Sequence, residues 1–117
     1  MTKKKQISIE FADEFQKRVR KLFKKYRSIK QDLTPIIQQL QNGETLGDRL
    51  SGVDNNAIYK VRVKNSDIKK GKSAGYRVLY LLKKETKIIL LTIYSKSEQA
   101  NISTKELLSI LQDFYGE

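Results

Sequence analysis

Hydrophobic and polar positions alternate with two different periods along the chain, and each period predicts one kind of element. Residues 6–11 alternate, with Ile7, Ile9 and Phe11 on one side, which predicts a first strand. From Asp13 the period becomes helical, with apolar side chains every three or four positions and basic side chains between them (Phe15, Val19, Leu22, Phe23 and Tyr26 against Lys17, Arg18, Arg20, Lys21, Lys24, Lys25 and Arg27). The chain therefore opens with a strand and a strongly basic amphipathic helix.

A second helix is predicted to begin at Ile29. Ser28 and Gln31 have the spacing of a capping box, and apolar residues follow at helical spacing. Pro35 lies inside this stretch, where a proline removes a hydrogen bond and crowds the preceding turn, so we expect a kink or a break there, with a possible restart at the proline itself. Gly43 is the expected end of the helix.

The second half of the chain predicts a loop followed by three strands. Residues 43–56 contain three glycines and several turn formers, which predicts a loop attached to the body by its few apolar residues (Leu46, Leu50 and Val53). Residues 57–64 alternate strictly, whereas 76–82 and 87–94 are nearly continuous apolar runs joined by a short hairpin. Such runs are typical of central strands that are covered on both faces.

The last element is a helix that begins after Ser103, which forms a second capping box with Glu106. The predicted order is β-α-α-β-β-β-α. We therefore expect a single α+β domain over residues 1–117, with a mainly antiparallel sheet packed against two N-terminal helices and a C-terminal helix.

The net charge of the chain indicates which kinds of molecule it could bind. Lys and Arg total 24 against 13 Asp and Glu, which gives a net charge of +11 on 117 residues. A surplus of this size favours a polyanionic partner such as nucleic acid, an acidic protein or an anionic membrane surface, although it also promotes solubility. The basic N-terminus is followed too soon by acidic residues to be a signal peptide, and the longest apolar run, residues 88–91, is far too short to span a bilayer. We expect a soluble, cytoplasmic protein.

The chain contains neither Cys nor His. The sequence therefore predicts no disulfide, no transition-metal site and no cofactor. Histidine is also the usual general acid or base, so any catalysis must use Lys, Arg, Tyr or a carboxylate.

The strand at residues 57–64 carries the most informative chemistry. Alternation puts Lys60, Arg62 and Lys64 on one face, with neighbouring cations roughly 7 Å apart, close to the spacing of successive phosphates. Arg77, in the next strand, can point toward the same cluster. The loop between these strands adds a basic rim of three lysines (Lys69, Lys70 and Lys72). The alternative is a solvated strand face, since edge strands often carry lysine to discourage aggregation.

Three segments resemble the signature blocks of RelE/HigB-type toxins of bacterial toxin–antitoxin modules, within the RelE/ParE superfamily. They are residues 59–64 (YKVRVK), 73–80 (SAGYRVLY) and 91–98 (LTIYSKSE). The resemblance covers essentially the whole chain and is nearest to the HigB-like branch. It implies a RelE-like fold and a ribosome-dependent mRNA endonuclease, in which the 2′-OH of the message attacks the adjacent phosphate and leaves a 2′,3′-cyclic phosphate without any metal. The implied partners are the ribosome, mRNA and a cognate antitoxin, expected to be a small helix-turn-helix protein.

By this resemblance, Lys60 and Arg62 match the paired strand cations of the family, and Arg77 matches the arginine of the GYR block. One basic group would assist deprotonation of the 2′-OH while the others stabilise the pentavalent phosphorane. Which of them acts as the base stays open.

The chain departs from the family pattern after the last strand. The best-known members carry a further Arg and a Tyr or His there, where this chain has Ser97 and Ser103. Lys96 is a candidate to supply a proton or charge instead, and Tyr94 is a candidate to stack on a base, although a tyrosine ending a buried strand is more often part of the core.

Two alternatives remain open at this stage. The first is a ParE-type toxin that inhibits DNA gyrase by binding; such relatives do not need the set Lys60, Arg62 and Arg77. The second is an RNA- or ribosome-binding module with weakened catalysis, for which Ser97 and Ser103 would be the signature.

Overall fold

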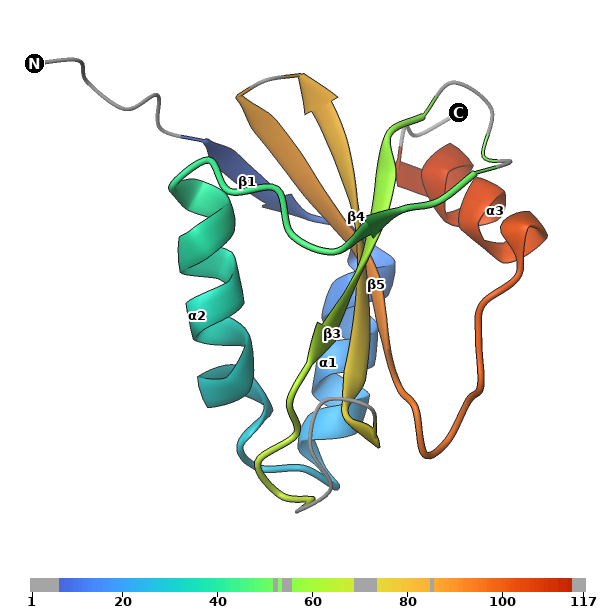
Figure 1. Ribbon diagram of the computed structural model, residues 1–117. Helices are drawn as coiled ribbons and strands as arrows, with labels where there is room; N and C mark the ends of the chain where they lie inside the picture. The colour runs from blue at the N-terminus through green and yellow to red at the C-terminus, as the bar shows by residue number, and fades with distance from the viewer. Residues whose placement is uncertain (1–6, 52, 54–55, 69–73, 85, 115–117) are drawn as a thin grey trace, which may run out of the picture.

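The computed structural model describes residues 7–51, 53, 56–68, 74–84 and 86–114, which form three helices and a five-stranded sheet (Figure 1). In chain order the elements are β1 Ser8–Phe11, α1 Asp13–Phe23, α2 Ile29–Gln41, β2 Asp48–Arg49, β3 Ile58–Val63, β4 Tyr76–Lys84, β5 Lys87–Ser95 and α3 Thr104–Phe114. The predicted α+β fold is confirmed.

The strands are arranged in the order β1-β5-β4-β3-β2. β1 runs parallel to β5, and every other neighbouring pair is antiparallel. The two long apolar strands, β4 and β5, are central as predicted. Each pairs with a strand on both sides, and core residues cover both of its faces. β2 lies in the predicted loop and was missed, because a strand of two residues has no periodicity to detect.

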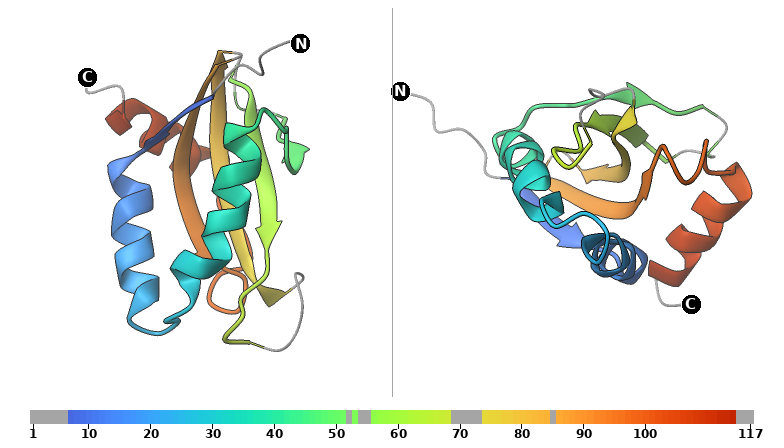
Figure 2. Two further views of the ribbon diagram at one scale, coloured as in Figure 1. Left: turned by 90° about the vertical axis from the view of Figure 1, so that its left-hand side faces the viewer. Right: turned by 90° about the horizontal axis from the view of Figure 1, so that it is seen from below.

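The helices cover opposite faces of the sheet (Figure 2). α1 and α2 lie side by side on one face, which we call the α1/α2 face, where Phe15 and Leu33 pack against Val61 and Tyr80. α3 lies on the other face, called the α3 face, where Leu107 and other apolar residues pack against the sheet (Leu111 from α3, with Ile58, Leu79 and Ile89 from the strands). Among the described residues, none of the helices is long and apolar enough to cross a membrane.

α1 forms where the sequence predicts it, with charges that suit a helix dipole. Asp13 and Glu14 lie in its first turn and Arg20 and Lys21 in its last, so each end of the helix carries the charge that stabilises it. Phe11, just before the helix, is 42% exposed, although the alternation of residues 6–11 predicts that it lies on the same side of the strand as Ile7 and Ile9, which pack into the core. Its ring nevertheless contacts a ring of α1, that of Phe15, at 5.8 Å between centroids.

α2 begins at Ile29 as predicted, but it continues through Pro35 to Gln41, so the expected break is wrong. A proline there removes only one backbone hydrogen bond, and buried apolar side chains before and after it (Ile29, Leu33 and Leu40) hold the helix against the sheet. The helix ends as predicted, with Gly43 at a φ of +91° and paired bonds from the amides of Gly43 and Glu44 back into the last turn.

The two predicted capping boxes have different outcomes. Ser103 accepts a hydrogen bond from the Glu106 amide at 3.1 Å, so the cap of α3 is confirmed. Ser28 makes no side-chain cap on α2. Its hydroxyl and amide instead both donate to the Asp67 carboxylate in the loop after β3, at 3.2 and 3.0 Å, and a charged acceptor makes such hydrogen bonds strong.

Candidate functional site

Three strands bring two arginines and a tyrosine into one row. Arg62 of β3 lies directly opposite Arg77 of β4, and Arg77 lies directly opposite Tyr94 of β5. Residues paired across antiparallel strands point to the same face, so this row lies on the α3 face. Lys60, two residues before Arg62, shares that face. We call Lys60, Arg62, Arg77 and Tyr94 the basic row.

The two arginines of the basic row differ in exposure. Arg62 is exposed, whereas Arg77 is only 5% exposed and donates from Nη1 to the Tyr76 carbonyl oxygen at 3.2 Å. Burial lowers the pKa of Arg77 below its ordinary value, and the charge of Arg62 lowers it further, while Tyr94 acts in the opposite direction. Like charges directly opposite each other destabilise a sheet, and a bound anion would relieve that repulsion.

A β-bulge in β5 decides that Tyr94 faces Arg77. Leu79 pairs with Thr92 but the next residue, Tyr80, pairs with Leu90, which leaves Leu91 as one extra residue. Before the bulge Leu90 faces α1 and α2; strict alternation would put Tyr94 on that same face. The extra residue reverses the alternation, so Tyr94 lies on the α3 face with Arg77.

Tyr94 is part of the core, which is the alternative that the sequence left open to its stacking on a base. It is 2% exposed and belongs to the core on the α3 face, so its ring is not available to stack on a base. Only its hydroxyl reaches a polar neighbour, donating to Asn101 Oδ1 at 3.4 Å. Burial raises the pKa of Tyr94, and the positive charge of Arg77 opposes that rise.

Asn101 joins the basic row from the loop after β5, although nothing in the sequence pattern predicts it. Its Oδ1 accepts from Lys60 Nζ at 3.4 Å as well as from Tyr94, and from the Ile102 amide at 2.9 Å. No local pattern indicates such a contact, because Lys60 and Asn101 are 41 positions apart in the chain.

Of the other lysines predicted for the site, Lys64 and Lys96 lie in the described part of the chain. Lys96 is exposed and donates from Nζ to the Ala100 carbonyl oxygen at 2.7 Å, within its own loop. Its amide donates to Gly75 at 2.9 Å, which extends the pairing with β4 one step beyond β5. Lys64 is exposed just after β3. The remaining rim residues lie outside the described part of the chain (Lys69, Lys70 and Lys72).

Ser97 and Ser103 do not lie in the basic row. The Ser97 hydroxyl is 3.3 Å from the Tyr26 hydroxyl and 2.9 Å from Ser95 Oγ, so it connects the loop to the segment between α1 and α2 and to the end of β5. The pKa of Tyr26 is lowered, with its hydrogen bond to Ser97 as the largest cause. Ser103 caps α3. Both serines therefore have structural contacts of their own.

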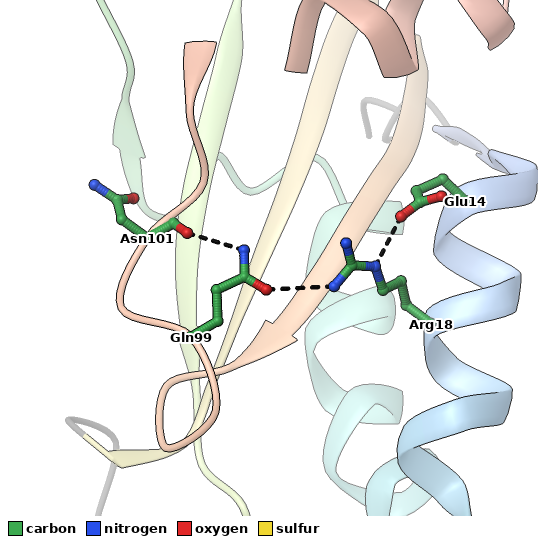
Figure 3. A network of polar contacts seen from close by, with 4 residues as sticks. All are labelled: Glu14, Arg18, Gln99 and Asn101. Atoms are coloured by element: carbon green, nitrogen blue, oxygen red, sulfur yellow. Dashed lines mark hydrogen bonds and ion pairs between the residues drawn. The ribbon is translucent and has the colours of Figure 1, made fainter. Parts of the chain in front are cut away.

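A chain of polar contacts holds the loop of residues 96–103 against α1 (Figure 3). Glu14 pairs with Arg18 Nε at 2.7 Å, Arg18 Nη1 donates to Gln99 Oε1 at 3.3 Å, and Gln99 Nε2 donates to the Asn101 carbonyl oxygen at 2.9 Å. A second anchor joins Lys25 of the segment after α1 to the loop through Glu98, at 3.2 Å.

A groove of about 480 Å³ borders the edge of β3 beside the basic row. Lys60 and Arg62 line it together with residues of α2 and the β2 segment (Ile36, Gln39, Leu46, Gly47 and Asp48). β2 pairs only with Tyr59 and Lys60, so it does not cover the rest of that edge. In the described segments, no group of three or more Asp, Glu, His or Cys is placed to hold a metal ion.

A family model described as the RelE toxin of the RelE / RelB toxin-antitoxin system matches residues 13–113, from the start of α1 almost to the end of α3. No curated protein matches the chain. The matched range contains every member of the basic row and Asn101.

Proposed function

The chain belongs to the RelE toxin family, and from this premise we propose that it stops translation by cutting messenger RNA on the ribosome. It is the toxin of a toxin–antitoxin pair, so a cognate antitoxin is its natural partner. We further propose that this antitoxin is a small helix-turn-helix protein encoded next to the toxin, and that the toxin acts in the cytoplasm.

The pairing of Arg62 with Arg77 is the observation that carries the proposal. Two guanidinium groups on neighbouring strands are suited to the non-bridging oxygens of one phosphate, because each fork can donate two parallel hydrogen bonds. The two positive charges repel each other and so destabilise the folded protein. A phosphate bound between them would attract both. Preorganised cations are most effective where negative charge develops in the transition state.

The proposed reaction is a transesterification within the RNA. The ribose 2′-oxygen attacks the adjacent phosphorus while the bond from phosphorus to the 5′-oxygen breaks, which leaves a 2′,3′-cyclic phosphate and a 5′-OH. The 2′-OH proton passes to a base, and the departing 5′-oxygen gains a proton. Arg62 and Arg77 stabilise the phosphorane, Lys60 lies beside them as a further cation, and Lys96 is the candidate to supply charge or a proton at the leaving group. Lys64 and the lysines of the following loop would hold the flanking phosphates.

A second candidate function is binding of RNA or the ribosome without efficient cleavage. The observation that favours it is the use of Ser97 and Ser103 in structural contacts, at positions where the resemblance leads one to expect an Arg and a Tyr or His. The two candidates share the basic row and differ only in the chemistry that follows binding.

Induced expression in bacteria tests the proposal. We expect protein synthesis to stop and new mRNA ends to map within translated codons, whereas purified RNA alone should be cut poorly. Arg77→Ala should lower cleavage by about 10²- to 10³-fold, the usual effect of removing one donor to a developing anion. Because Arg77 is buried, the exposed Arg62→Ala gives a second variant whose fold is less at risk.

Lys87→Ala is the matched control, since it removes one cation at the far end of β5, where Lys87 pairs with Glu10. Loss of DNA supercoiling with continued protein synthesis would refute the proposal in favour of a gyrase inhibitor. Undiminished cleavage by Arg77→Ala and Arg62→Ala would refute the assignment of the basic row, and brisk cleavage of naked RNA would refute ribosome dependence.

A further inference from the structure

We propose that Asn101 is the positioning residue of the basic row. Its side-chain oxygen holds the Lys60 ammonium group and the Tyr94 hydroxyl at one point, and the anchored loop of residues 96–103 determines where that oxygen lies. This inference rests on the proposed function, because it assigns Asn101 a role in holding a cation that contacts the RNA.

The strengths of the three contacts at Asn101 Oδ1 are unequal. The bond from the Ile102 amide, at 2.9 Å, is of ordinary length and fixes the carboxamide, while the contacts from Lys60 and Tyr94, both at 3.4 Å, are long. A carboxamide oxygen has two lone pairs, so after Ile102 is bound the two remaining donors share one. Lys60 is therefore kept in place but held weakly, and a phosphate oxygen can replace Asn101 as its acceptor.

A neutral acceptor is essential to this arrangement. Aspartate has the same shape as asparagine, but its charge would form an ion pair with Lys60 and compete with the phosphate. Within the described part of the chain, ion pairs form at Arg18, Lys25 and Lys87, whereas Lys60 forms none. Asn101 thus orients the ammonium group and leaves its charge for the RNA.

The position of Asn101 depends on α1, which packs on the opposite face of the sheet. Gln99 connects the two by donating to the Asn101 carbonyl oxygen and accepting from Arg18 (Figure 3). Arg18 is itself held by Glu14 of the preceding helical turn. Loss of this anchor should loosen Asn101 without removing any group from the basic row.

Binding of a short single-stranded RNA, measured by fluorescence anisotropy at several salt concentrations, separates charge from position. Asn101→Asp should weaken binding about tenfold and reduce the salt slope by about 0.7, as for the loss of one phosphate contact. Asn101→Ala should bind within about twofold of the wild type, since it changes no charge. Asn42→Asp is the control, because it makes the same charge change at the end of α2, away from the row.

Cleavage in a translation extract gives the second readout. Asn101→Ala should cut at saturating ribosome concentration about 10- to 100-fold more slowly than the wild type despite near-normal binding, because a misplaced group lowers the rate more than the affinity. Arg18→Gln should show a smaller loss of the same kind. Asn101→Ser, which restores a small neutral acceptor, should recover part of the rate.

Several outcomes would overturn the inference. One is Asn101→Asp binding and cutting like Asn42→Asp; another is Asn101→Ala losing affinity and rate equally. If the Asn101 variants do not fold, Arg18→Gln decides, and a normal rate for it refutes the role of the anchor. Wild-type protein that binds RNA without cutting it refutes the proposed function alone, and the binding measurements then decide the inference. Wild-type protein that binds no RNA refutes both.

Discussion

The hydroxyl of Tyr80 fastens the loop after α2 to the centre of the sheet. It donates to the Leu46 carbonyl oxygen at 2.6 Å and accepts from the Leu46 amide at 2.9 Å, while its ring stacks on Tyr59 at 5.3 Å. Tyr80 is fully buried, and burial raises its pKa to about 12. One side chain thus satisfies both backbone groups of the partly buried Leu46.

This pKa predicts a loss of stability at high pH. The phenol ionises near pH 10 in the unfolded chain but only near pH 12 in the folded one, so the stabilisation is complete below pH 10 and is lost as the pH rises toward 12. The free energy of unfolding should fall by about 1.4 kcal/mol per pH unit in that window for this tyrosine. Burial also raises the pKa of Tyr76, which adds to the slope in the same direction.

Urea unfolding at pH 8, 10 and 11 measures the effect. Tyr80→Phe should have a shallower pH slope than the wild type and should be less stable at pH 8 by about 1–3 kcal/mol, because the two Leu46 groups lose their partner. Equal slopes for the two proteins would contradict the assignment to Tyr80.

Residue type predicted part of the site and tertiary contacts supplied the rest. Alternation within one strand was enough to put Lys60 and Arg62 on one face, since a strand has a period of two. Asn101 was missed, because a polar residue in a loop after a strand is ordinary until the loop's path is known. Ser97 lies where the family resemblance leads one to expect a catalytic side chain. In the structure its hydroxyl contacts Tyr26 and Ser95.

At the level of elements, two glycines with positive φ end α2 and lead into β2 for different reasons. Gly43, at φ +91°, has open space where a Cβ would lie. Gly47, at φ +81°, lies against β3, and a Cβ there would be 2.2 Å from the Lys60 carbonyl oxygen. The first position requires only the left-handed conformation, while the second also requires the close approach of β2 to β3.

Alanine substitutions should separate these two requirements. Gly43→Ala should destabilise the protein by about 1 kcal/mol, the cost of the left-handed conformation for a residue with a Cβ. Gly47→Ala should cost clearly more, roughly 3 kcal/mol or above, because strand backbone must also move. Urea unfolding measures both. Equal losses of unfolding free energy would show that the backbone at Lys60 moves away from the added Cβ at little energetic cost.

α2 illustrates how packing overrides local preference. Pro35 predicts an interruption, yet the helix is continuous because Leu33 and Leu40 on either side pack into the core of the α1/α2 face. The short β2 is the converse case: two polar residues, Asp48 and Arg49, become a strand only because β3 offers an edge to pair with.

For the molecule as a whole, the basic residues that give the net charge of +11 lie on more than one surface. The outward side of α1 carries exposed basic residues, while the basic row lies on the opposite face of the sheet beside α3. Some of the α1 cations already have partners, such as Arg18 with Glu14. Under the proposed function, the total charge would give a general attraction to RNA, and the basic row would determine where one phosphate is bound.

Salt dependence separates these two contributions. Binding of single-stranded RNA should weaken steeply as salt rises, with a slope that changes by about 0.7 for each phosphate contact removed. Arg62→Ala should reduce the slope by about that amount, while Lys87→Ala, whose cation pairs with Glu10 at the far end of β5, should leave it unchanged. Equal effects of the two substitutions would indicate that only net charge matters.

The sequence by itself determined the class of fold and the residue types of the candidate site. Periodicity located three helices and the four longer strands, because burial of one face imposes a period of 3.6 or 2 on neighbouring residues. The absence of His and Cys left Lys, Arg, Tyr or a carboxylate for any catalysis, and the surplus of Lys and Arg favoured a polyanionic partner. Alternation also grouped Lys60 with Arg62, since both lie within one element.

Only the tertiary structure decided which residues meet across elements. The register between β3 and β4 set Arg62 opposite Arg77, and one extra residue at Leu91 turned Tyr94 to the same face. The loop anchored to α1 brought Asn101 to Lys60. Register, a bulge and a loop path each depend on contacts between segments far apart in the chain, so a local period does not contain them.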